Sequence, residues 1–260
     1  MTDASARGRF VWHDLMTTDP AAAVAFYTKV AGWGTEQWKG GGGPPYTMWT
    51  VNGAPIGGVM SMPENVAGMP PHWISYVCVP DTDATAKQAS ALGGTVHRPP
   101  TDIPTVGRFA VITDPQGAPI AIFTPQAQAP GHEGAPNLGE FSWHELMTTD
   151  YAAAFDFYSA LFGWQRGDAH DMGPMGIYQL YSRNGVQLGG MFNKPADMPA
   201  PPNWMVYIMV DSADRAAERV TKNGGKVVNG PMEVPGGDRI AQCMDPQGGM
   251  FAVHSKGAMS

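Results

Sequence analysis

The chain contains nearly the same stretch of sequence twice. "FVWHDLMTTDPAAAVAFY" runs from Phe10 to Tyr27, and "FSWHELMTTDYAAAFDFY" runs from Phe141 to Tyr158, 131 residues later in a chain of 260. A period this long exceeds the units of roughly 20–50 residues that solenoid proteins stack. The repeat therefore predicts one domain that has been duplicated, and whatever fold the first copy adopts the second must adopt as well.

Further residue pairs follow the same spacing outside the opening stretch. They are Trp73 and Trp204, Gly93-Gly94 and Gly224-Gly225, and the motif "DPQG" at Asp114–Gly117 and Asp245–Gly248. The segment "QAQAPGHEGAPNL" between the copies is rich in Pro, Gly and Ala, which is typical of an exposed connection. We predict a first domain over residues 1–126, a linker over 127–138 and a second domain over 139–260.

Each copy shows the pattern strand, helix, strands, and shows it twice. "RFVWHDLMTT" alternates like a half-buried strand, Asp19 is placed to cap a helix that begins at Pro20, and Asn52-Gly53 is a tight-turn dipeptide of a hairpin. A second round follows from His72, with Asp81 or Asp83 as the helix cap. The expected class is α+β, with two βαβββ modules per domain and four per chain, at about 9–62, 72–125, 140–194 and 203–255.

Composition limits the function classes. The net charge of −7 argues against a nucleic-acid footprint, and no apolar run approaches the roughly 20 residues of a membrane helix. Cys78 and Cys243 lie in apolar segments at matching places, which favours buried small side chains over a disulfide. We expect a cytoplasmic protein whose partner is a small molecule, with no nucleic acid and no membrane, as a monomer or homodimer.

The motifs of both copies resemble those of the vicinal oxygen chelate superfamily, which includes glyoxalase I, bleomycin-resistance proteins and extradiol dioxygenases. The matching residues are Asp19, Phe26, Tyr27, Gly32, Trp33 and Asp114–Gly117, with Asp150, Phe157, Tyr158, Gly163, Trp164 and Asp245–Gly248 in the second copy. The openings also resemble two-domain glyoxalase-like proteins of actinobacterial type. The resemblance implies a U-shaped mixed sheet in each domain, with the helices outside and a ligand cavity inside.

Members of this superfamily hold a divalent metal with His and Glu side chains, and the resemblance implies where those should stand. The corresponding positions are Trp12, Ile74 and Ala121 in the first copy and Trp143, Met205 and Ala252 in the second. The hairpin strand that often supplies another Glu reads "IGGVM" and "LGGMF". None of these side chains is a suitable donor for a transition metal, so no metal ligand is predicted, although the family implies a divalent metal.

His13 and His144 lie one residue beyond the ligand positions. Because strand side chains alternate between faces, a one-residue offset turns an imidazole to the opposite side. We expect both histidines, with Leu15, to pack between sheet and helix; a ligand role would need a bulge or a register shift.

The same alternation places acidic residues in each predicted cavity. Asp14 and Glu145 are expected to point inward as candidate catalytic acids, together with Tyr76 and Tyr207, and Arg108 and Arg239 are their possible partners. A structural carboxylate bonded to Tyr, His or backbone is the alternative. The candidate ligand-binding residues that line the cavities are Trp12, Met16, Tyr46, Trp143, Met147, Tyr178 and Met205.

We therefore expect a protein of glyoxalase, bleomycin-resistance or dioxygenase type that binds a small aromatic or oxygenated molecule in each domain without the usual metal ligands. Two alternatives remain open: a metal-dependent lyase or dioxygenase of glyoxalase I type, and a metal-free acid/base enzyme that uses Asp14 or Glu145. Whether the chain is an enzyme at all, as a lyase or an oxidoreductase, is left open by the sequence.

Overall fold

The computed structural model describes residues 6–40, 46–62 and 68–257. The first half of the chain contains β1 (Phe10–Thr17), α1 (Pro20–Ala31), β2 (Gly34–Gln37), β3 (Thr47–Val51), β4 (Ala54–Ser61), β5 (His72–Cys78), α2 (Thr82–Ala91), β6 (Thr95–Ile103), β7 (Gly107–Thr113) and β8 (Pro119–Pro125). The second half contains β9 (Phe141–Thr148), α3 (Tyr151–Phe162), β10 (Gln165–Asp171), η2 (Gly173–Met175), β11 (Ile177–Arg183), β12 (Val186–Asn193), β13 (Asn203–Met209), α4 (Ala213–Lys222), β14 (Lys226–Glu233), β15 (Arg239–Met244) and β16 (Met250–Ser255).

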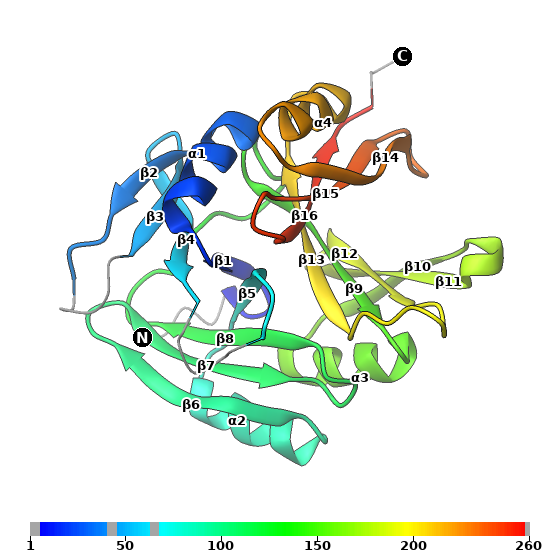
Figure 1. Cartoon of the computed structure of the whole chain (residues 1–260). Coiled ribbons are helices and arrows are strands. Elements are labelled where there is room, and N and C mark those ends of the chain that lie inside the picture. The colour runs from blue at the N-terminus through cyan, green and yellow to red at the C-terminus, as the bar shows by residue number, and fades with distance from the viewer. Residues whose placement is uncertain (1–5, 41–45, 63–67, 258–260) are drawn as a thin grey trace. The chain divides into compact units, whose positions relative to one another are not determined.

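Each half forms one eight-stranded mixed sheet, which confirms the predicted α+β class and the duplicated βαβββ modules. The strand order is β2-β3-β4-β1-β5-β8-β7-β6 in the first sheet and β10-β11-β12-β9-β13-β16-β15-β14 in the second (Figure 1). Within each module the first strand pairs in parallel with the last, as β1 does with β4 and β5 with β8. The hairpins between the other strands are antiparallel.

Local sequence signals set the helix ends. The side chain of Asp19 accepts a hydrogen bond from the backbone of Ala22 at 2.9 Å, and α1 ends at Gly32, whose φ of +74° suits glycine. Asp81, and not Asp83, caps α2. Among the described residues, no helix is long and apolar enough to cross a membrane.

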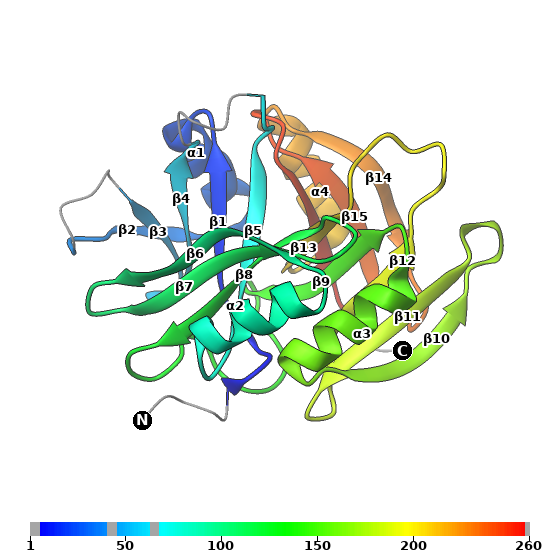
Figure 2. The ribbon, with the colours of Figure 1, turned by 90° about the horizontal axis from the view of Figure 1, so that it is seen from below.

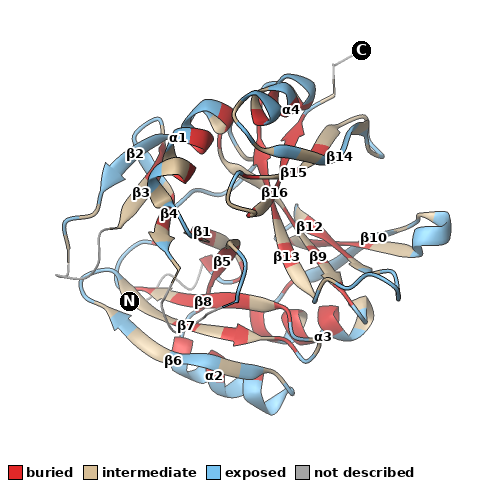
Figure 3. Ribbon diagram, viewed as in Figure 1, coloured by how far each residue is buried: buried red, intermediate tan, exposed pale blue. Residues whose placement is uncertain are grey.

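The strands β2 and β10 could not be located from the sequence. Every residue of β2 is exposed, and so are nearly all those of β10, so neither strand shows the apolar alternation that reveals a half-buried strand (Figure 3). The hairpin between β3 and β4 across Asn52-Gly53 is confirmed.

The contacts divide the chain into two compact units, each built from parts of both halves. Unit 1 comprises Met1–Trp12, Ile74–His132 and His144–Trp204, and unit 2 comprises His13–Trp73, Glu133–Trp143 and Met205–Ser260. Unit 1 contains α2 and α3, which lie side by side (Figure 2), and unit 2 contains α1 and α4, which are also in contact. Each unit thus joins the helix of a first module to the helix of a second module from the other half.

Unit 2 is held together by a buried hydrogen-bond chain that links the two halves. The hydroxyl of Tyr27 on α1 donates to Asp245 Oδ2 at 3.0 Å, and Trp73 Nε1 donates to the Tyr27 oxygen at 3.2 Å. Oδ1 of Asp245 accepts hydrogen bonds from the backbone of Gln247 and Gly249. Burial raises the pKa of Asp245, whereas the donated hydrogen bonds lower it. The "DPQG" motif therefore closes its own turn and also anchors a helix from the other half.

Unit 1 contains the equivalent series of hydrogen bonds, with the tyrosine now from the second half and the aspartate from the first. Tyr158 on α3 donates to Asp114 Oδ2 at 3.0 Å, and Trp204 Nε1 donates to the Tyr158 oxygen at 3.1 Å. Large apolar side chains surround each series of hydrogen bonds, including Phe26 and Phe251 in unit 2 and Phe157 in unit 1. Sequence periodicity found the apolar positions, but it gave no sign that the halves exchange these partners.

The units differ beside the ends of α1 and α3. In unit 1, Arg7 donates through Nη2 to the carbonyl oxygens of Leu161 at 3.0 Å and Ala160 at 3.3 Å. The position equivalent to Arg7 in unit 2 is Leu138, which is 60% exposed. A pocket of about 420 Å³ lies at this place in unit 2, lined by residues that include Leu138, Trp33 and Arg219.

Candidate functional site

A tyrosine and a carboxylate on the first sheet form a hydrogen-bonded pair across three strands. Tyr46 directly precedes β3, and its hydroxyl donates to Oδ1 of Asp14 on β1 at 2.5 Å. The strand β4 lies between them in the sheet, and its Gly58 is the register partner of Asp14. Asp14 is only 3% exposed, and Tyr46 is half-buried. The hydrogen bond of this pair therefore lies where little water competes for it.

The second sheet repeats this arrangement with one extra methylene. Tyr178 on β11 donates to Oε2 of Glu145 on β9 at 2.8 Å, and β12 with its Gly190 lies between them. Glu145 is half-buried, in contrast to the buried Asp14. The change from Asp to Glu preserves the phenol–carboxylate pair and brings the carboxylate closer to solvent.

The double glycines of the hairpin strands explain how a ring can cross the middle strand. A Cβ on Gly58 would collide with the ring and hydroxyl of Tyr46, and one on Gly190 would collide with the ring of Tyr178. On the neighbouring residues, a Cβ on Gly57 would meet the carbonyl of His13, and one on Gly189 the carbonyl of His144. The glycines of this strand, where the family often has a glutamate, thus leave the space that the tyrosine ring occupies.

The other predicted cavity residues divide between the two units. Tyr76 is buried in unit 1, where its ring centroid is 6.0 Å from that of Phe109. Tyr207 is buried in unit 2, where its hydroxyl accepts a hydrogen bond from Gln242 Nε2 at 3.4 Å. The predicted wall residues Trp12, Met16, Trp143, Met147 and Met205 are all half-buried. That these residues share a cavity with Asp14 or Glu145 stays a prediction.

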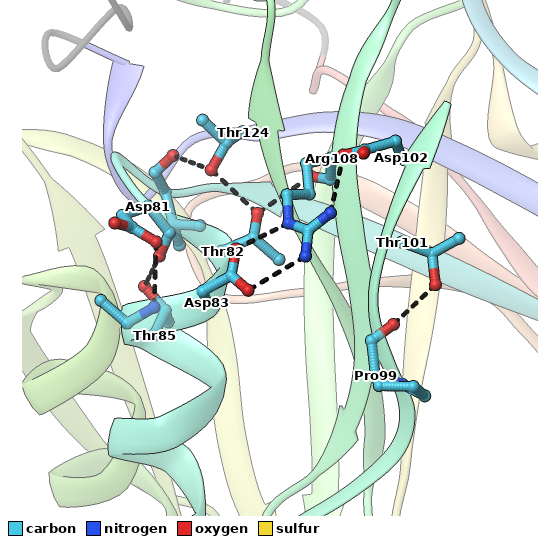
Figure 4. Close-up of polar contacts among 11 residues, drawn as sticks. Asp81, Thr82, Asp83, Thr85, Pro99, Thr101, Asp102, Arg108 and Thr124 are labelled. Atoms are coloured by element: carbon cyan, nitrogen blue, oxygen red, sulfur yellow. Dashed lines mark hydrogen bonds and ion pairs between the residues drawn. The ribbon is translucent and has the colours of Figure 1, made fainter. Parts of the chain in front are cut away.

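Arg108 and Arg239 do not pair with the candidate acids, and this prediction was wrong. Arg108 binds Asp83 through Nε at 2.6 Å and Asp102 through Nη1 at 2.7 Å (Figure 4). Arg239 binds Asp214 through Nε at 2.7 Å. Each arginine lies on a strand, β7 or β15, that contacts the helix of its own module, where an acidic residue in the first helical turn offers a nearer partner.

His13 and His144 are buried and stacked on phenylalanines of the other half. The His144 ring lies 3.5 Å from that of Phe10 in unit 1, and the His13 ring lies 3.8 Å from that of Phe141 in unit 2. Burial lowers the pKa of His144 to about 3, while a hydrogen bond with the backbone of Leu188 acts in the opposite direction. Leu15 belongs to the core that contains α1, as predicted.

The residues at the family's metal-ligand positions do not fit a metal ion. Ala121 and Ala252 are fully buried methyl groups, each beside a tyrosine strand neighbour, Tyr76 and Tyr207. Across residues 6–40, 46–62 and 68–257, no group of three or more His, Cys, Asp or Glu side chains is placed to hold a metal. Cys78 and Cys243 are buried and are not joined in a disulfide, as predicted, and burial raises the pKa of Cys243 to about 12.

Sequence reasoning missed one polar cluster in unit 2. Ser142, His254 and Asp238 form a hydrogen-bonded row, and the residues 131 positions earlier are Val11, Phe123 and Gly107. Comparison of the two halves position by position would have exposed this difference, since three apolar or small residues of one copy are polar in the other.

The chain has relatives along nearly its whole length. It is 37% identical over 248 residues to CFP32 of Mycobacterium tuberculosis, a protein provisionally named a glyoxylase, with 93% of this chain and 92% of that one covered. It is 31% identical over 261 residues to the anthracycline biosynthesis protein DnrV of Streptomyces peucetius, covering 95% and 93%.

A solved structure shares the fold. The Mn(II)-bound glyoxalase from Novosphingobium aromaticivorans superposes with a TM-score of 0.66 at 17% identity, over 98% of this chain and 83% of that one. Residues 9–122 and 140–253 each match the same family. From these matches and the duplicated modules, the chain belongs to the Glyoxalase/Bleomycin resistance protein/Dioxygenase superfamily.

Proposed function

We propose that each half of the chain binds a small aromatic molecule bearing hydroxyl or NH groups, and that the phenol–carboxylate pair recognises it without the family's metal donors. The observation that carries this proposal is the phenol–carboxylate pair itself, which occurs in both sheets at equivalent strands. A carboxylate can accept several hydrogen bonds, so Asp14 and Glu145 can each accept from a ligand in addition to a tyrosine.

The surroundings of the pairs support an aromatic ligand. Tyr46 contacts the ring of Trp38, with centroids 6.3 Å apart, and Tyr178 stacks on Phe192 at 5.9 Å. Aromatic faces bind flat ligands by offset or edge contacts. The similarity to a protein of anthracycline biosynthesis supports the same ligand class, because anthracyclines contain a hydroxylated aromatic ring system.

Calorimetric titration with 1,4-dihydroxyanthraquinone, the type of chromophore found in anthracyclines, tests the proposal. We expect saturable binding to the unmodified chain. The double variant Asp14→Asn, Glu145→Gln should bind roughly 10- to 100-fold more weakly, since a hydrogen bond to a charged group contributes about 1.5–3 kcal/mol. Glu218→Gln, on the exposed face of α4, is the matched control for loss of an acid.

Unchanged affinity in the double variant would show that the carboxylates serve only the fold. A separate measurement addresses the metal. Elemental analysis of protein purified without chelators should find no stoichiometric transition metal, because alanine, tryptophan, isoleucine and methionine occupy the ligand positions. A bound metal at one equivalent per half would contradict this donor count.

A further inference from the structure

Three polar side chains of the second half form a continuous row within unit 2. Ser142 lies on β9, His254 on β16, and Asp238 in the turn before β15. Ser142 Oγ is 2.9 Å from His254 Nδ1, and His254 Nε2 is 2.9 Å from Asp238 Oδ2. A hydroxyl, an imidazole and a carboxylate in this order are the groups by which hydrolases of unrelated folds activate a serine.

The carboxylate decides which imidazole nitrogen carries the proton. Burial acts to raise the pKa of Asp238, but hydrogen bonds from Lys256 and His254 outweigh it and hold that pKa at about 2. An ionised carboxylate only accepts hydrogen bonds, so Nε2 of His254 must be the donor. Burial lowers the pKa of His254, so the ring is neutral near pH 7 and the lone pair of Nδ1 faces Ser142 Oγ.

The hydroxyl of Ser142 has two acceptors within reach. The nearer is His254 Nδ1 at 2.9 Å, and the backbone carbonyl oxygen of Tyr207 lies at 3.3 Å. Ser142 is half-buried, whereas His254 is only 8% exposed. A base that is better shielded from water than the residue bearing the hydroxyl suits nucleophilic catalysis.

Asp238 is itself held in place. Its Oδ1 accepts a hydrogen bond from the backbone of Gly257 at 3.1 Å, and its Oδ2 also accepts one from Lys256 Nζ at 2.9 Å. The backbone of Val234 donates to the Asp238 carbonyl and closes the turn. These contacts fix the carboxylate toward the imidazole and leave it few alternative positions.

The first half shows that the fold does not require these polar groups. The same strand positions carry Val11 and Phe123 there, and Gly107 stands where Asp238 does. A buried imidazole and the carboxylate hydrogen-bonded to it cost free energy that apolar residues at these places would avoid. The second half carries the polar residues despite this cost. Such a difference between the halves is expected of a functional site and not of residues that serve only packing.

We propose that Ser142, with His254 as its base and Asp238 as a positioning residue, is a nucleophile that accepts acyl groups from small carboxylic esters. This site uses none of the residues of the phenol–carboxylate pairs, so it stands independently of the ligand-binding function proposed above. It assigns to the second half a chemistry that the first half lacks.

The reaction balances with water as the only co-reactant. The Ser142 hydroxyl proton passes to His254 Nδ1 as Oγ attacks the ester carbonyl carbon. The bond between that carbon and the alcohol oxygen breaks, and the alcohol leaves with the proton from Nδ1. Water then attacks the acyl-serine carbon and gives a proton to Nδ1; the carbon–Oγ bond breaks, Oγ recovers the proton, and the carboxylic acid leaves.

Covalent labelling of the full chain tests the proposal. A fluorophosphonate probe reacts with activated serine hydroxyls, and peptide mapping by mass spectrometry finds the labelled residue. We expect the label on Ser142, together with hydrolysis of p-nitrophenyl acetate. Ser142→Val, which installs the first half's residue, should abolish the label. His254→Phe, which does the same at the base, should slow labelling by about 10²- to 10⁴-fold.

Controls separate chemistry from folding. Ser75→Val places in the first half the residue that the second half has at Val206, and it should leave labelling unchanged. Thermal unfolding of each variant reports whether it folds, and Ser142→Ala replaces Ser142→Val if the valine does not fit.

The role of Asp238 has its own readout. Asp238 raises the pKa of His254 and Lys256 lowers it, so Asp238→Asn should shift the rise of the labelling rate with pH toward lower pH. A merely structural carboxylate would reduce the amount of folded protein without moving this midpoint. Failure of Ser142 to label in folded protein, or an equal labelling rate in His254→Phe, would overturn the proposal.

Discussion

The two halves of the chain share one fold but treat their polar side chains differently. The phenol–carboxylate pair occurs in both, with Asp14 buried in the first half and Glu145 half-buried in the second. The row of Ser142, His254 and Asp238 occurs only in the second. One polar arrangement is therefore common to both halves and another belongs to the second alone, and residues that differ between equivalent positions are the better guide to what distinguishes the halves.

The largest expected effect concerns the buried His144. Its pKa of about 3 lies below the ordinary 6.5, so the folded chain binds fewer protons than the unfolded chain between these values. The stabilising contribution is complete above pH 6.5 and is lost as pH falls toward 3, by up to about 4–5 kcal/mol. Urea unfolding across this pH range measures it.

The variant His144→Phe keeps a ring against Phe10 and removes the titrating group, so its stability should fall less between pH 6.5 and 3. His97→Phe, at an exposed histidine, is the control. The parallel variant His13→Phe reports whether the first half shares this acid sensitivity. Equal pH profiles for His144→Phe and the unmodified chain would contradict the prediction.

The next effect tests whether the two compact units are equivalent. Tyr27→Phe removes the hydroxyl that donates to Asp245, and Tyr158→Phe removes the one that donates to Asp114. Each should cost about 1.5–3 kcal/mol, because a buried carboxylate loses a donor. We expect the two losses in free energy of unfolding to agree within about 0.5 kcal/mol, and a larger gap would show that one unit is the weaker.

Substitution of the glycines beneath the two tyrosine rings compares the surroundings of the two carboxylates. Gly58→Ala and Gly190→Ala should each cost about 1–3 kcal/mol, because the new Cβ displaces a tyrosine ring. The first should cost more, since Asp14 is the more deeply buried acid. Denaturant titration measures both. In a Tyr46→Leu background, the added cost of Gly58→Ala should shrink, and a cost that stays the same would exclude the ring as its cause.

The smallest effect concerns the difference beside the helix ends. Arg7→Ala removes the cation that contacts the last carbonyls of α3 and should cost about 0.3–1 kcal/mol, less at high salt. Leu138→Ala, at the equivalent position of unit 2, should change stability by less than about 0.5 kcal/mol, because Leu138 is mostly exposed. Thermal unfolding at two salt concentrations separates them, and equal losses would mean that Arg7 acts only through packing.

Much of the fold followed from the sequence because the repeat, the helix caps and the hairpin dipeptide are local signals. Asp19, Gly32 and Asn52-Gly53 act on their own neighbours along the chain, so their positions predict structure directly. The strands β2 and β10 escaped prediction because exposed edge strands carry no periodic apolar signal.

The candidate site was predicted less completely because it depends on partners distant in sequence. Alternation along one strand singled out Asp14, but only the structure identified Tyr46 as the donor that reaches it across Gly58. Arg108 was assigned the wrong partner because charge alone does not fix which acid lies nearest. The pairing of Tyr27 in the first half with Asp245 in the second leaves no pattern in the sequence.

That pairing has a consequence for dissecting the protein. Since the tyrosine of one copy donates a hydrogen bond to the turn aspartate of the other, a polypeptide ending in the linker would leave both Asp114 and Tyr27 without these partners. The two copies expressed as separate fragments should recover structure only when mixed, as a complementing pair, and the evolution of either copy is constrained by the sequence of its sister.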